Sequence, residues 1–505
     1  MLKIVNYLKR IKRFLLTLLR RHFGTKEQED IERIRNSRYF NAEYYLSEYP
    51  DIKESGIDPA EHYYSHGTAE LRNPSASFNT EKFIGQFNLP SDKNPLIVCL
   101  DYIETHPDYR PPKVEDETFD DFLYRYFPQS APLKTSVSMP LVKPRLNLIF
   151  NGFDKSVLFG GKMTALQLAV AYCNDANADL RIISQQPDPN LFYEFMQTNG
   201  LKANFEVSFF SLNQGGYLEI DPMDDFLCTM WCNADAVLHT PTITGRIFYI
   251  MQEVETFFCD HGDMELRAYN ILSDRRLIPI VNTELLYDYL CDNGYSNVAN
   301  CGCRFEPAFS KRFFSPGKTS FAKKQKHVLF YYAGPSHRQN LFYFGAEVLN
   351  EALIRGILDP DTWSLCMVKD DTMPKVSFDV EFDVDIKSPM SYDEYAKFLS
   401  DVDLCFSMNY TPHPGYAPLD AVSAGAVSLT NTYANKKDLG DYSANIVMAE
   451  LNLESMLDGL KKAIELAENV QQREENYLNR TNTHGEWPEV LSSIIDYMKA
   501  AEKDV

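Results

Sequence analysis

Residues 327–340, HVLFYYAGPSHRQN, combine an apolar run with a glycine turn and a polar segment. Residues 327–332 have the composition of a buried strand, and Gly334, Arg338 and Asn340 follow it. A strand that enters a glycine turn before a helix offers an anion backbone N–H groups and the helix dipole, and an arginine adds a planar fork. We expect this segment to bind a diphosphate. The alternative for Arg338 is an exposed residue that caps the next helix.

A strand, loop, helix and strand pattern spans residues 401–433. The sequence predicts a strand at 402–408, a proline-rich loop, a helix at 419–426 and a second strand at 426–430. The loop would lie at the carboxyl edge of a parallel sheet, where open α/β sheets bind ligands. The candidate ligand contacts are His413, Pro414, Tyr416, Asp420, in the first helical turn, and Asn431.

Residues 246–258, RIFYIMQEVETFF, place two carboxylates directly after an apolar run. If residues 247–251 form a strand, Gln252, Glu253 and Glu255 lie at its carboxyl end. A carboxylate there can accept a proton from a hydroxyl group, or orient that group. The alternative is that these acids begin a helix whose dipole favours them. The sequence does not show which of Glu253 and Glu255 acts.

Gly160 and Gly161 lie between a strand expected at 145–151 and a helix expected at 163–172. A Gly-Gly turn lets backbone amides come close to a ligand at the amino end of a helix. Lys369, at the exit of another expected strand, is a further candidate for a phosphate or base contact. Additional strands are expected at 180–184, 205–209, 236–239 and 277–282.

The order of these motifs resembles that of retaining GT-B glycosyltransferases of family 4. The pattern at 401–433 resembles their donor-nucleotide motif, 334–340 their strand-Gly-Arg-Pro segment, and 160–161 their glycine loop. PHPGYAPLD followed by TNTYANKKDL and SANIV is more similar to bacterial dTDP-rhamnose-dependent rhamnosyltransferases of the WsaF type, which have a run similar to 252–255. His413 stands near the first acid of the family motif, and Asp420 replaces its second Glu.

The resemblance implies an α/β fold of the GT-B class, with two Rossmann-like domains, a deep cleft between them and a small all-α extension in front. It implies a retaining transferase that moves a sugar, with L-rhamnose from dTDP-rhamnose as the favoured donor. The acceptor would be a lipid-linked or polysaccharide glycan of the cell surface or O-antigen type. Arg338 would stabilise the departing diphosphate. Asp420 would hold a nucleotide or sugar hydroxyl and His413 would contact the donor. Glu253 or Glu255 would align the acceptor.

We expect no cofactor, and no divalent metal for the chemistry. Asp401 and Asp403 match the Asp-x-Asp pattern of GT-A enzymes, but they precede a buried strand instead of ending one, so we interpret them as solvated strand-entry acids. Two alternative functions stay open. One is a transferase that uses a UDP- or GDP-sugar. The other is a non-catalytic nucleotide-binding scaffold of a glycan-assembly complex, which the residues at His413 and Asp420 keep open.

Length and composition predict two large domains and an extension. A chain of 505 residues is too long for one ordinary core, and 44% apolar with 24% charged residues is typical of a globular protein. The expected segments are a basic amphipathic helix (1–26), a helical repeat extension (37–112), a linker (113–142), an acceptor domain (143–310), a donor domain (326–475) and terminal helices that cross back toward the acceptor domain (476–505).

The extension contains two related copies. FNAEYYL at 40–46 matches FNTEKFI at 78–84, and Asp58-Pro59 and Asn94-Pro95 carry helix-start signals. These copies resemble the aromatic-rich helical repeats found in front of bacterial polysaccharide glycosyltransferases. We interpret their Tyr and Phe side chains as core in preference to a sugar platform.

Charge is distributed unevenly along the chain. The net charge is −21, yet residues 1–26 hold eight Lys or Arg and no acid. The acidic remainder argues against nucleic-acid binding. The basic segment has an apolar helical stripe that is too short to span a bilayer. We therefore expect a cytoplasmic protein that residues 1–24 attach to the inner face of the membrane. A helix packed on its own protein is the alternative. The ten cysteines lack zinc-site spacing and fit a reducing cytoplasm.

Overall fold

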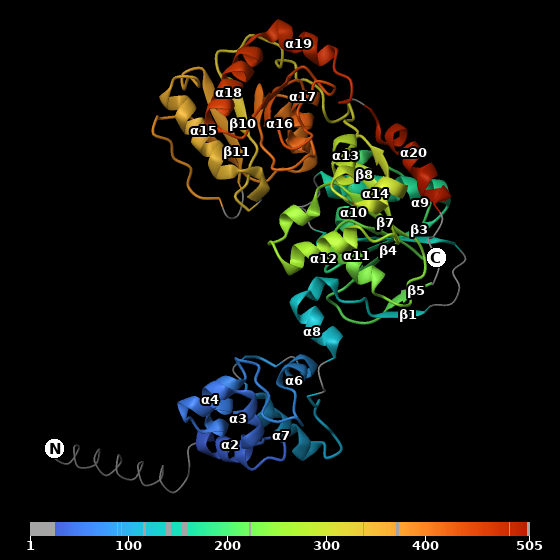
Figure 1. Cartoon of the computed structure of the whole chain (residues 1–505), viewed down its shortest axis with the longest axis vertical. Coiled ribbons are helices and arrows are strands. Elements are labelled where there is room, and N and C mark those ends of the chain that lie inside the picture. Colours follow the sequence, from blue (N-terminus) through green and yellow to red (C-terminus); the bar gives the residue numbers. More distant parts are fainter. Residues whose placement is uncertain are drawn as a thin grey trace, which may run out of the picture. The chain divides into compact units, whose positions relative to one another are not determined.

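The chain forms two compact units, Met1–Tyr126 and Phe127–Val505. The computed structural model describes residues 26–87, 89–91, 93–114, 118–137, 143–153, 160–221, 224–336, 338–369, 373–483 and 485–501. All of the basic helix expected at 1–26 except Lys26 therefore lies outside the described residues. Figure 1 labels the elements. Among the described residues, no helix combines the length and apolar character that a membrane span requires.

The first unit is all helical. Its elements are α2 (Lys26–Arg35), α3 (Ala42–Glu48), α4 (Pro50–Ser55), α5 (Pro59–His62), η1 (Tyr63–Gly67), α6 (Thr80–Phe87), α7 (Pro95–Thr105) and α8 (Phe119–Tyr126). Asp58 caps α5 and Asn94 caps α7, each followed by its proline, as the sequence predicts. Matching aromatic residues of the two copies, Tyr45 and Phe83, are fully buried in one cluster, so these side chains are core.

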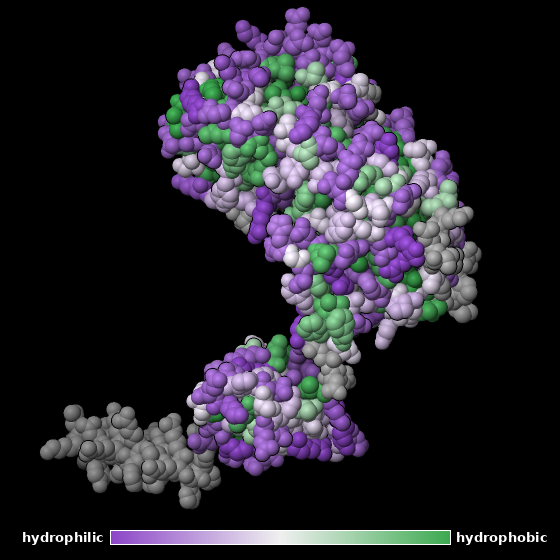
Figure 2. Space-filling view, viewed as in Figure 1, coloured by the Kyte–Doolittle hydropathy of each residue, from purple (hydrophilic) through white to green (hydrophobic). Residues whose placement is uncertain are grey.

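Helix α8 differs from the rest of the unit because none of its residues is buried. Phe119, Phe122 and Tyr126 are 71%, 60% and 61% exposed. Figure 2 shows the resulting apolar surface over this helix.

The first lobe of the second unit is built on a seven-stranded parallel sheet in the order β4-β3-β2-β6-β7-β8-β9. The strands are β2 (Arg145–Ile149), β3 (Asp179–Ser184), β4 (Val207–Ser211), β6 (Asp225–Cys228), β7 (Ile247–Met251), β8 (Leu277–Asn282) and β9 (Cys303–Phe305), and a separate pair joins β1 (Thr135–Val137) to β5 (Leu218–Ile220). The helical elements are α9 (Gly161–Ala176), α10 (Pro189–Asn199), α11 (Trp231–Leu238), η4 (Glu255–Phe258), α12 (Asp263–Leu272), α13 (Glu284–Asp292) and α14 (Ser296–Cys301). The prediction of a strand at 236–239 is wrong, because α11 ends in this segment.

The second lobe has a six-stranded parallel sheet in the order β12-β11-β10-β13-β14-β15. Its strands are β10 (His327–Tyr331), β11 (Trp363–Val368), β12 (Val384–Lys387), β13 (Leu404–Phe406), β14 (Val427–Asn431) and β15 (Ile446–Ala449). The helical elements are η5 (Arg338–Asn340), α15 (Phe342–Ile354), α16 (Tyr392–Leu399), α17 (Tyr416–Ser423), α18 (Leu453–Glu468), α19 (Val470–Leu478) and α20 (Trp487–Ala500). Each sheet therefore has one point where the strand order reverses, β2/β6 and β10/β13, and ligands of such sheets bind at the carboxyl ends there.

Helix α20 packs on the first lobe although it follows the second lobe in sequence. Leu491 and Met498 are fully buried in the first lobe's core cluster. The guanidinium of Arg246 donates to the carbonyl of Met498 at 2.7 Å, and Lys499 forms an ion pair with Asp175 at 2.6 Å. The segment that follows the second lobe thus ends on the first lobe.

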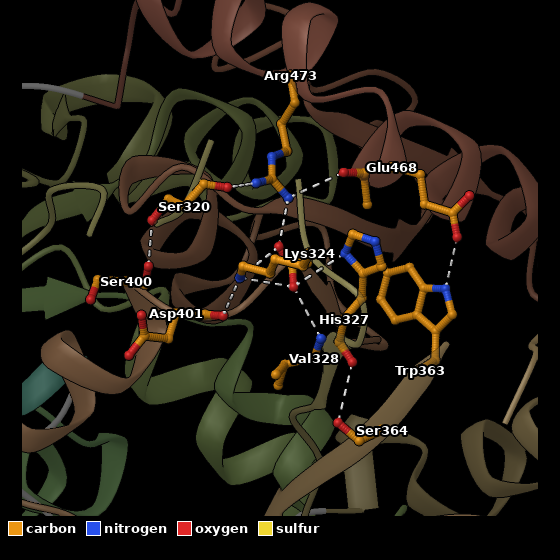
Figure 3. A network of polar contacts seen from close by, with 12 residues as sticks. Ser320, Lys324, His327, Val328, Trp363, Ser364, Ser400, Asp401, Glu468 and Arg473 are labelled. Atoms are coloured by element: carbon orange, nitrogen blue, oxygen red, sulfur yellow. Dashed lines mark hydrogen bonds and ion pairs between the residues drawn. The ribbon is translucent and has the colours of Figure 1, made fainter. Parts of the chain in front are cut away.

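Asp403 is part of a buried ion network and not a solvated acid, so that expectation is wrong. Figure 3 shows the basic side chains that converge on this network at the amino end of the second sheet. Its carboxylate lies 2.9 Å from Lys324 Nζ, 3.0 Å from a guanidinium nitrogen of Arg473 and 3.4 Å from His327 Nδ1. Burial opposes ionisation, but His327, Lys324 and the backbone N–H of Val328 outweigh it and lower the pKa of Asp403 to about 2. Asp401 is exposed, as expected.

Candidate active site

Tyr416, the first residue of α17, connects the second lobe to the first. Its hydroxyl lies 2.7 Å from Thr164 Oγ1 and 2.5 Å from Asn282 Nδ2. It also donates to Gln252 Oε1 at 3.4 Å. Thr164 is on α9 and Asn282 ends β8, so one phenol joins separate elements of the opposite lobe.

The Gly160-Gly161 turn contacts protein where a ligand was expected. Gly160 has φ +51°, and a Cβ atom there would lie 3.2 Å from the ring of Tyr416. A Cβ atom on Gly161 would lie 2.9 Å from Gln252 Nε2, which donates to the Gly161 carbonyl at 2.8 Å. Gly160 therefore lets Tyr416 of the second lobe approach the start of α9, and Gly161 leaves room for Gln252 of the first lobe.

Glu253 is the acid that crosses between the lobes. It follows β7, and its carboxylate accepts hydrogen bonds from Thr411 Oγ1 at 2.5 Å and Asn409 Nδ2 at 3.2 Å. Both partners lie in the loop after β13. Burial raises the pKa of Glu253, and these two hydrogen bonds and the charge of Lys436 act in the opposite direction.

Lys436 completes this cluster and was not among the residues predicted from sequence. It has no exposed surface, and its Nζ lies 3.4 Å from the carbonyl of Asn409 and 3.3 Å from that of His413. Burial lowers its pKa to about 8, while Glu253 works to raise it. Nothing in TNTYANKKDL distinguishes this lysine from its neighbour Lys437, which is exposed.

Glu255 turns into the first lobe and does not take part in the interlobe cluster. Its carboxylate accepts from the backbone N–H of Trp231 at 2.7 Å and from the hydroxyl of Tyr249. Burial raises its pKa to about 7. Of the two candidate acids, Glu253 is the one whose hydrogen-bond partners belong to the second lobe.

His413 is buried with a fixed tautomer. Its Nδ1 accepts a hydrogen bond from the backbone N–H of Gly415 at 3.0 Å, so the proton of the neutral ring is on Nε2. Within the described part of the chain, Nε2 has no hydrogen-bond partner. Burial, aided by the charge of Lys436, lowers the pKa of His413 to about 3. The ring is therefore neutral, and its Nε2–H is a buried donor that no described residue satisfies.

Asp420 and Asn431 support the loop from the second lobe. Helix α17 begins at Tyr416, so Asp420 is its fifth residue and not part of its first turn as expected. Tyr395 donates to its carboxylate at 3.4 Å, and burial raises the pKa of Asp420 well above its ordinary value. Asn431 accepts from the Asn409 N–H at 2.7 Å and donates to the Asn409 carbonyl at 3.1 Å, and Pro414 is buried beside them.

Arg338 is exposed at the start of η5, and residues 332–337 separate it from the end of β10 at Tyr331. Helix α15 starts only at Phe342, after Leu341 in the left-handed conformation, so the expectation that Arg338 lies at the amino end of that helix is wrong. The Gln339 carbonyl accepts the Tyr410 N–H at 2.9 Å, which ties this turn to the loop that contacts Glu253. The remaining predicted contacts are partly exposed or exposed at the same sheet edge: Gly334, Asn340 and Lys369.

Solved structures share this arrangement of two facing Rossmann-like lobes. Sucrose-phosphate synthase from Thermosynechococcus elongatus matches with a TM-score of 0.52 and 12% identity, covering 71% of this chain and 98% of that one. HepE from Anabaena, in complex with UDP and glucose, has a TM-score of 0.50 and 10% identity, with 71% and 100% covered. A mutant of TarM from S. aureus, in complex with fondaparinux, alpha-GlcNAc-glycerol and UDP, gives the same four values. The fold is GT-B.

Two sequence comparisons concern parts of the chain. Residues 326–461 match the family model described as WsaF, C-terminal domain. The O-antigen biosynthesis protein RfbC of Myxococcus xanthus is 24% identical over 278 residues, which are 54% of this chain and 20% of RfbC. This chain thus spans about a fifth of the length of that relative. The family match falls on the second lobe, which holds Arg338, His413, Asp420 and Lys436.

Proposed function

We propose that this chain is a retaining glycosyltransferase that moves a sugar, with L-rhamnose from dTDP-rhamnose as the donor, onto a growing cell-surface or O-antigen-type glycan. The observation that carries the proposal is the interlobe cluster of Glu253, Thr411, Asn409 and Lys436 at the carboxyl edges of two Rossmann-like sheets. The WsaF match of the second lobe and the O-antigen relative support the glycan pathway. The resemblance of PHPGYAPLD to dTDP-rhamnose-dependent transferases supports the donor.

The donor would be held by the second lobe. The guanidinium of Arg338, exposed beside the switch point of the sheet, would grip the diphosphate and stabilise its charge as the sugar departs. His413 would donate its Nε2 hydrogen to an oxygen atom of the donor, because that hydrogen has no partner among the described residues. Asp420, whose pKa is raised by burial, would bind a hydroxyl group of the nucleotide or sugar.

The acceptor would be oriented by the first lobe. Glu253 lies between the lobes, and its raised pKa favours a hydrogen bond between its carboxyl group and an acceptor hydroxyl. Lys436 would fix the positions of the carbonyls of Asn409 and His413 relative to the Glu253 carboxylate. A divalent metal is not part of this proposal. In the part of the chain that the structure describes, no group of three or more His, Cys, Asp or Glu side chains is placed to hold one.

A thermal-shift panel of dTDP-rhamnose, UDP-glucose and GDP-mannose tests the proposal. A ligand that binds only the folded chain raises its melting temperature in proportion to RT ln(1 + [L]/Kd). We expect dTDP-rhamnose to stabilise the wild type and to lose this effect with Arg338→Ala. Arg275→Ala, which removes another exposed arginine, is the matched control. Stabilisation by none of the three nucleotide sugars would refute the proposal.

Two rival functions give different results in the same experiment. HepE and TarM were solved with UDP, so a response to UDP-glucose alone would assign a UDP-sugar donor. A nucleotide-binding scaffold would show the thermal shift without any release of free nucleotide over time. Nucleotide release is therefore measured on the same samples.

We also propose that residues 1–24 hold the protein on anionic membrane surfaces. Deletion of this segment should move the protein from sedimented vesicles to the supernatant while dTDP-rhamnose binding is kept. Equal sedimentation of both proteins would favour a helix packed on its own protein.

A further inference from the structure

Four aromatic side chains form a continuous row on the second unit. Tyr410 and Tyr433 have ring centroids 4.6 Å apart, Tyr433 and Phe257 6.0 Å, and Phe257 and Tyr289 6.2 Å. Interplanar angles of 60°, 75° and 70° make all three contacts edge-to-face. We call these four residues the aromatic row.

The aromatic row is shared between the lobes and stays open to solvent. Phe257 lies on η4 and Tyr289 on α13 of the first lobe, whereas Tyr410 and Tyr433 lie in the loops after β13 and β14 of the second. Tyr410 is 50% and Phe257 38% exposed, and the other two are partly buried. Contiguous exposed aromatic surface is uncommon on folded proteins and marks sites of interaction.

The loops that carry the row also carry the charged cluster. Tyr410 stands between Asn409 and Thr411, the two residues whose side chains bind Glu253. Tyr433 is paired with Lys436 through two backbone hydrogen bonds of 3.0 and 2.8 Å. These connections place Tyr410 and Tyr433 directly beside the polar interlobe cluster.

The turn that presents Tyr433 is held under strain. Ala434 has φ +47°, a left-handed conformation that costs an alanine roughly 1–2 kcal/mol. The neighbouring Asn435 donates its side-chain amide to the Leu285 carbonyl of the first lobe at 2.7 Å. The same hairpin thus buries Lys436, reaches the other lobe and sets Tyr433 against Phe257.

We propose that the aromatic row is the acceptor platform, on which a pyranose ring of a glycan stacks so that one of its hydroxyl groups meets Glu253. A pyranose has an apolar face of C–H groups, and the negative face of an aromatic ring attracts such weakly positive hydrogens. Tyr410 and Tyr433 add phenol groups for sugar hydroxyls. The link to Glu253 rests on the proposed transferase function, whereas carbohydrate binding by the row does not.

Saturation-transfer NMR on the full chain tests the inference, with α-L-rhamnose oligosaccharides as probes and dextran oligosaccharides of equal length for comparison. Ring C–H protons of the rhamnose probes should receive the strongest saturation. Tyr410→Ala and Phe257→Ala should each weaken binding at least tenfold. Tyr343→Ala, which removes a 69% exposed tyrosine from α15, should leave it unchanged.

Two results would overturn the inference: wild-type chain that binds none of the rhamnose probes, and row variants that bind as tightly as wild type. The thermal shift with dTDP-rhamnose is recorded on each variant and should be unchanged. If Tyr410→Ala abolishes the nucleotide response and leaves glycan binding intact, the row contacts the donor base, and the inference is wrong. If dTDP-rhamnose does not shift the melting temperature of the wild-type chain, the proposed function is contradicted. Carbohydrate binding by the aromatic row would be unaffected by that result.

Discussion

The contact between the lobes through Tyr416 can be tested by removing one oxygen atom. Tyr416→Phe keeps the ring that packs on Gly160 and deletes the hydroxyl that lies 2.7 Å from Thr164 Oγ1 and 2.5 Å from Asn282 Nδ2. Asn282 is fully buried, and its Oδ1 already lacks a partner in the described part of the chain. The substitution therefore removes the short hydrogen bond of this buried amide and leaves its Nδ2 only a contact of 3.5 Å with Gln252 Oε1.

The expected cost follows from that donor. A buried polar group left without a good hydrogen bond costs about 1–3 kcal/mol; the remaining contact with Gln252 reduces this cost and the lost contact with Thr164 adds to it, so the estimate is about 2 kcal/mol. For a unit of this size such a loss lowers the melting temperature by about 2–4 °C. Differential scanning calorimetry of the full chain measures the shift.

Tyr343→Phe is the matched control because that tyrosine is 69% exposed on α15. Its melting temperature should equal that of wild type. If Tyr416→Phe also melts like wild type, the hydroxyl does not hold the lobes together, and the interlobe site as described here is wrong.

Three further predictions concern charge and backbone. The folded chain holds the Lys436 proton less tightly than the unfolded chain, so the free energy of unfolding rises between pH 8 and 10.5. Lys436→Met should flatten this rise in urea melts and reduce nucleotide release. An unchanged pH dependence of the free energy of unfolding would contradict the buried, charged state of Lys436. Asp403 has a lowered pKa, so its contribution to the stability of the fold is complete above about pH 4 and is lost as pH falls toward 2. Asp403→Asn should lower the free energy of unfolding by about 3–5 kcal/mol at pH 7, because it removes the negative partner of the buried Arg473. Unchanged stability in denaturant melts would refute the network. Gly160→Ala should destabilise the chain more than Gly356→Ala, because Gly356 also has positive φ (+66°) but open space around it; equal melting temperatures would exclude the packing of Tyr416 on the turn.

Long apolar runs made much of the fold predictable. Strands β7 and β8 have the boundaries that their sequences indicate, because each is an apolar run with a clear end signal. Helix α11 was missed because ADAVLH is apolar and short enough to suit either a strand or a helix, and only packing decides. The edge strand β12, VDIK, has a half-exposed pattern without a continuous apolar run.

The site was predictable as a set of sequence motifs but not as a set of contacts. Gly160, Gln252 and Tyr416 were chosen separately, and the structure brings them together across 252 residues of sequence between Thr164 and Tyr416. The local pattern could not separate Glu253 from Glu255, since their partners lie on other elements. The sequence did not predict the role of Lys436 or the burial of Asp403 for the same reason: a charged residue is buried only when distant segments supply its partners.

The most direct test of the central claim is nucleotide release from dTDP-rhamnose by the purified full chain, with and without a lipid-linked glycan acceptor. We expect acceptor-dependent release of dTDP by wild type, its loss with Arg338→Ala and a strong reduction with Glu253→Gln. Release that is absent in wild type for dTDP-, UDP- and GDP-sugars alike, or that survives Arg338→Ala undiminished, would contradict it.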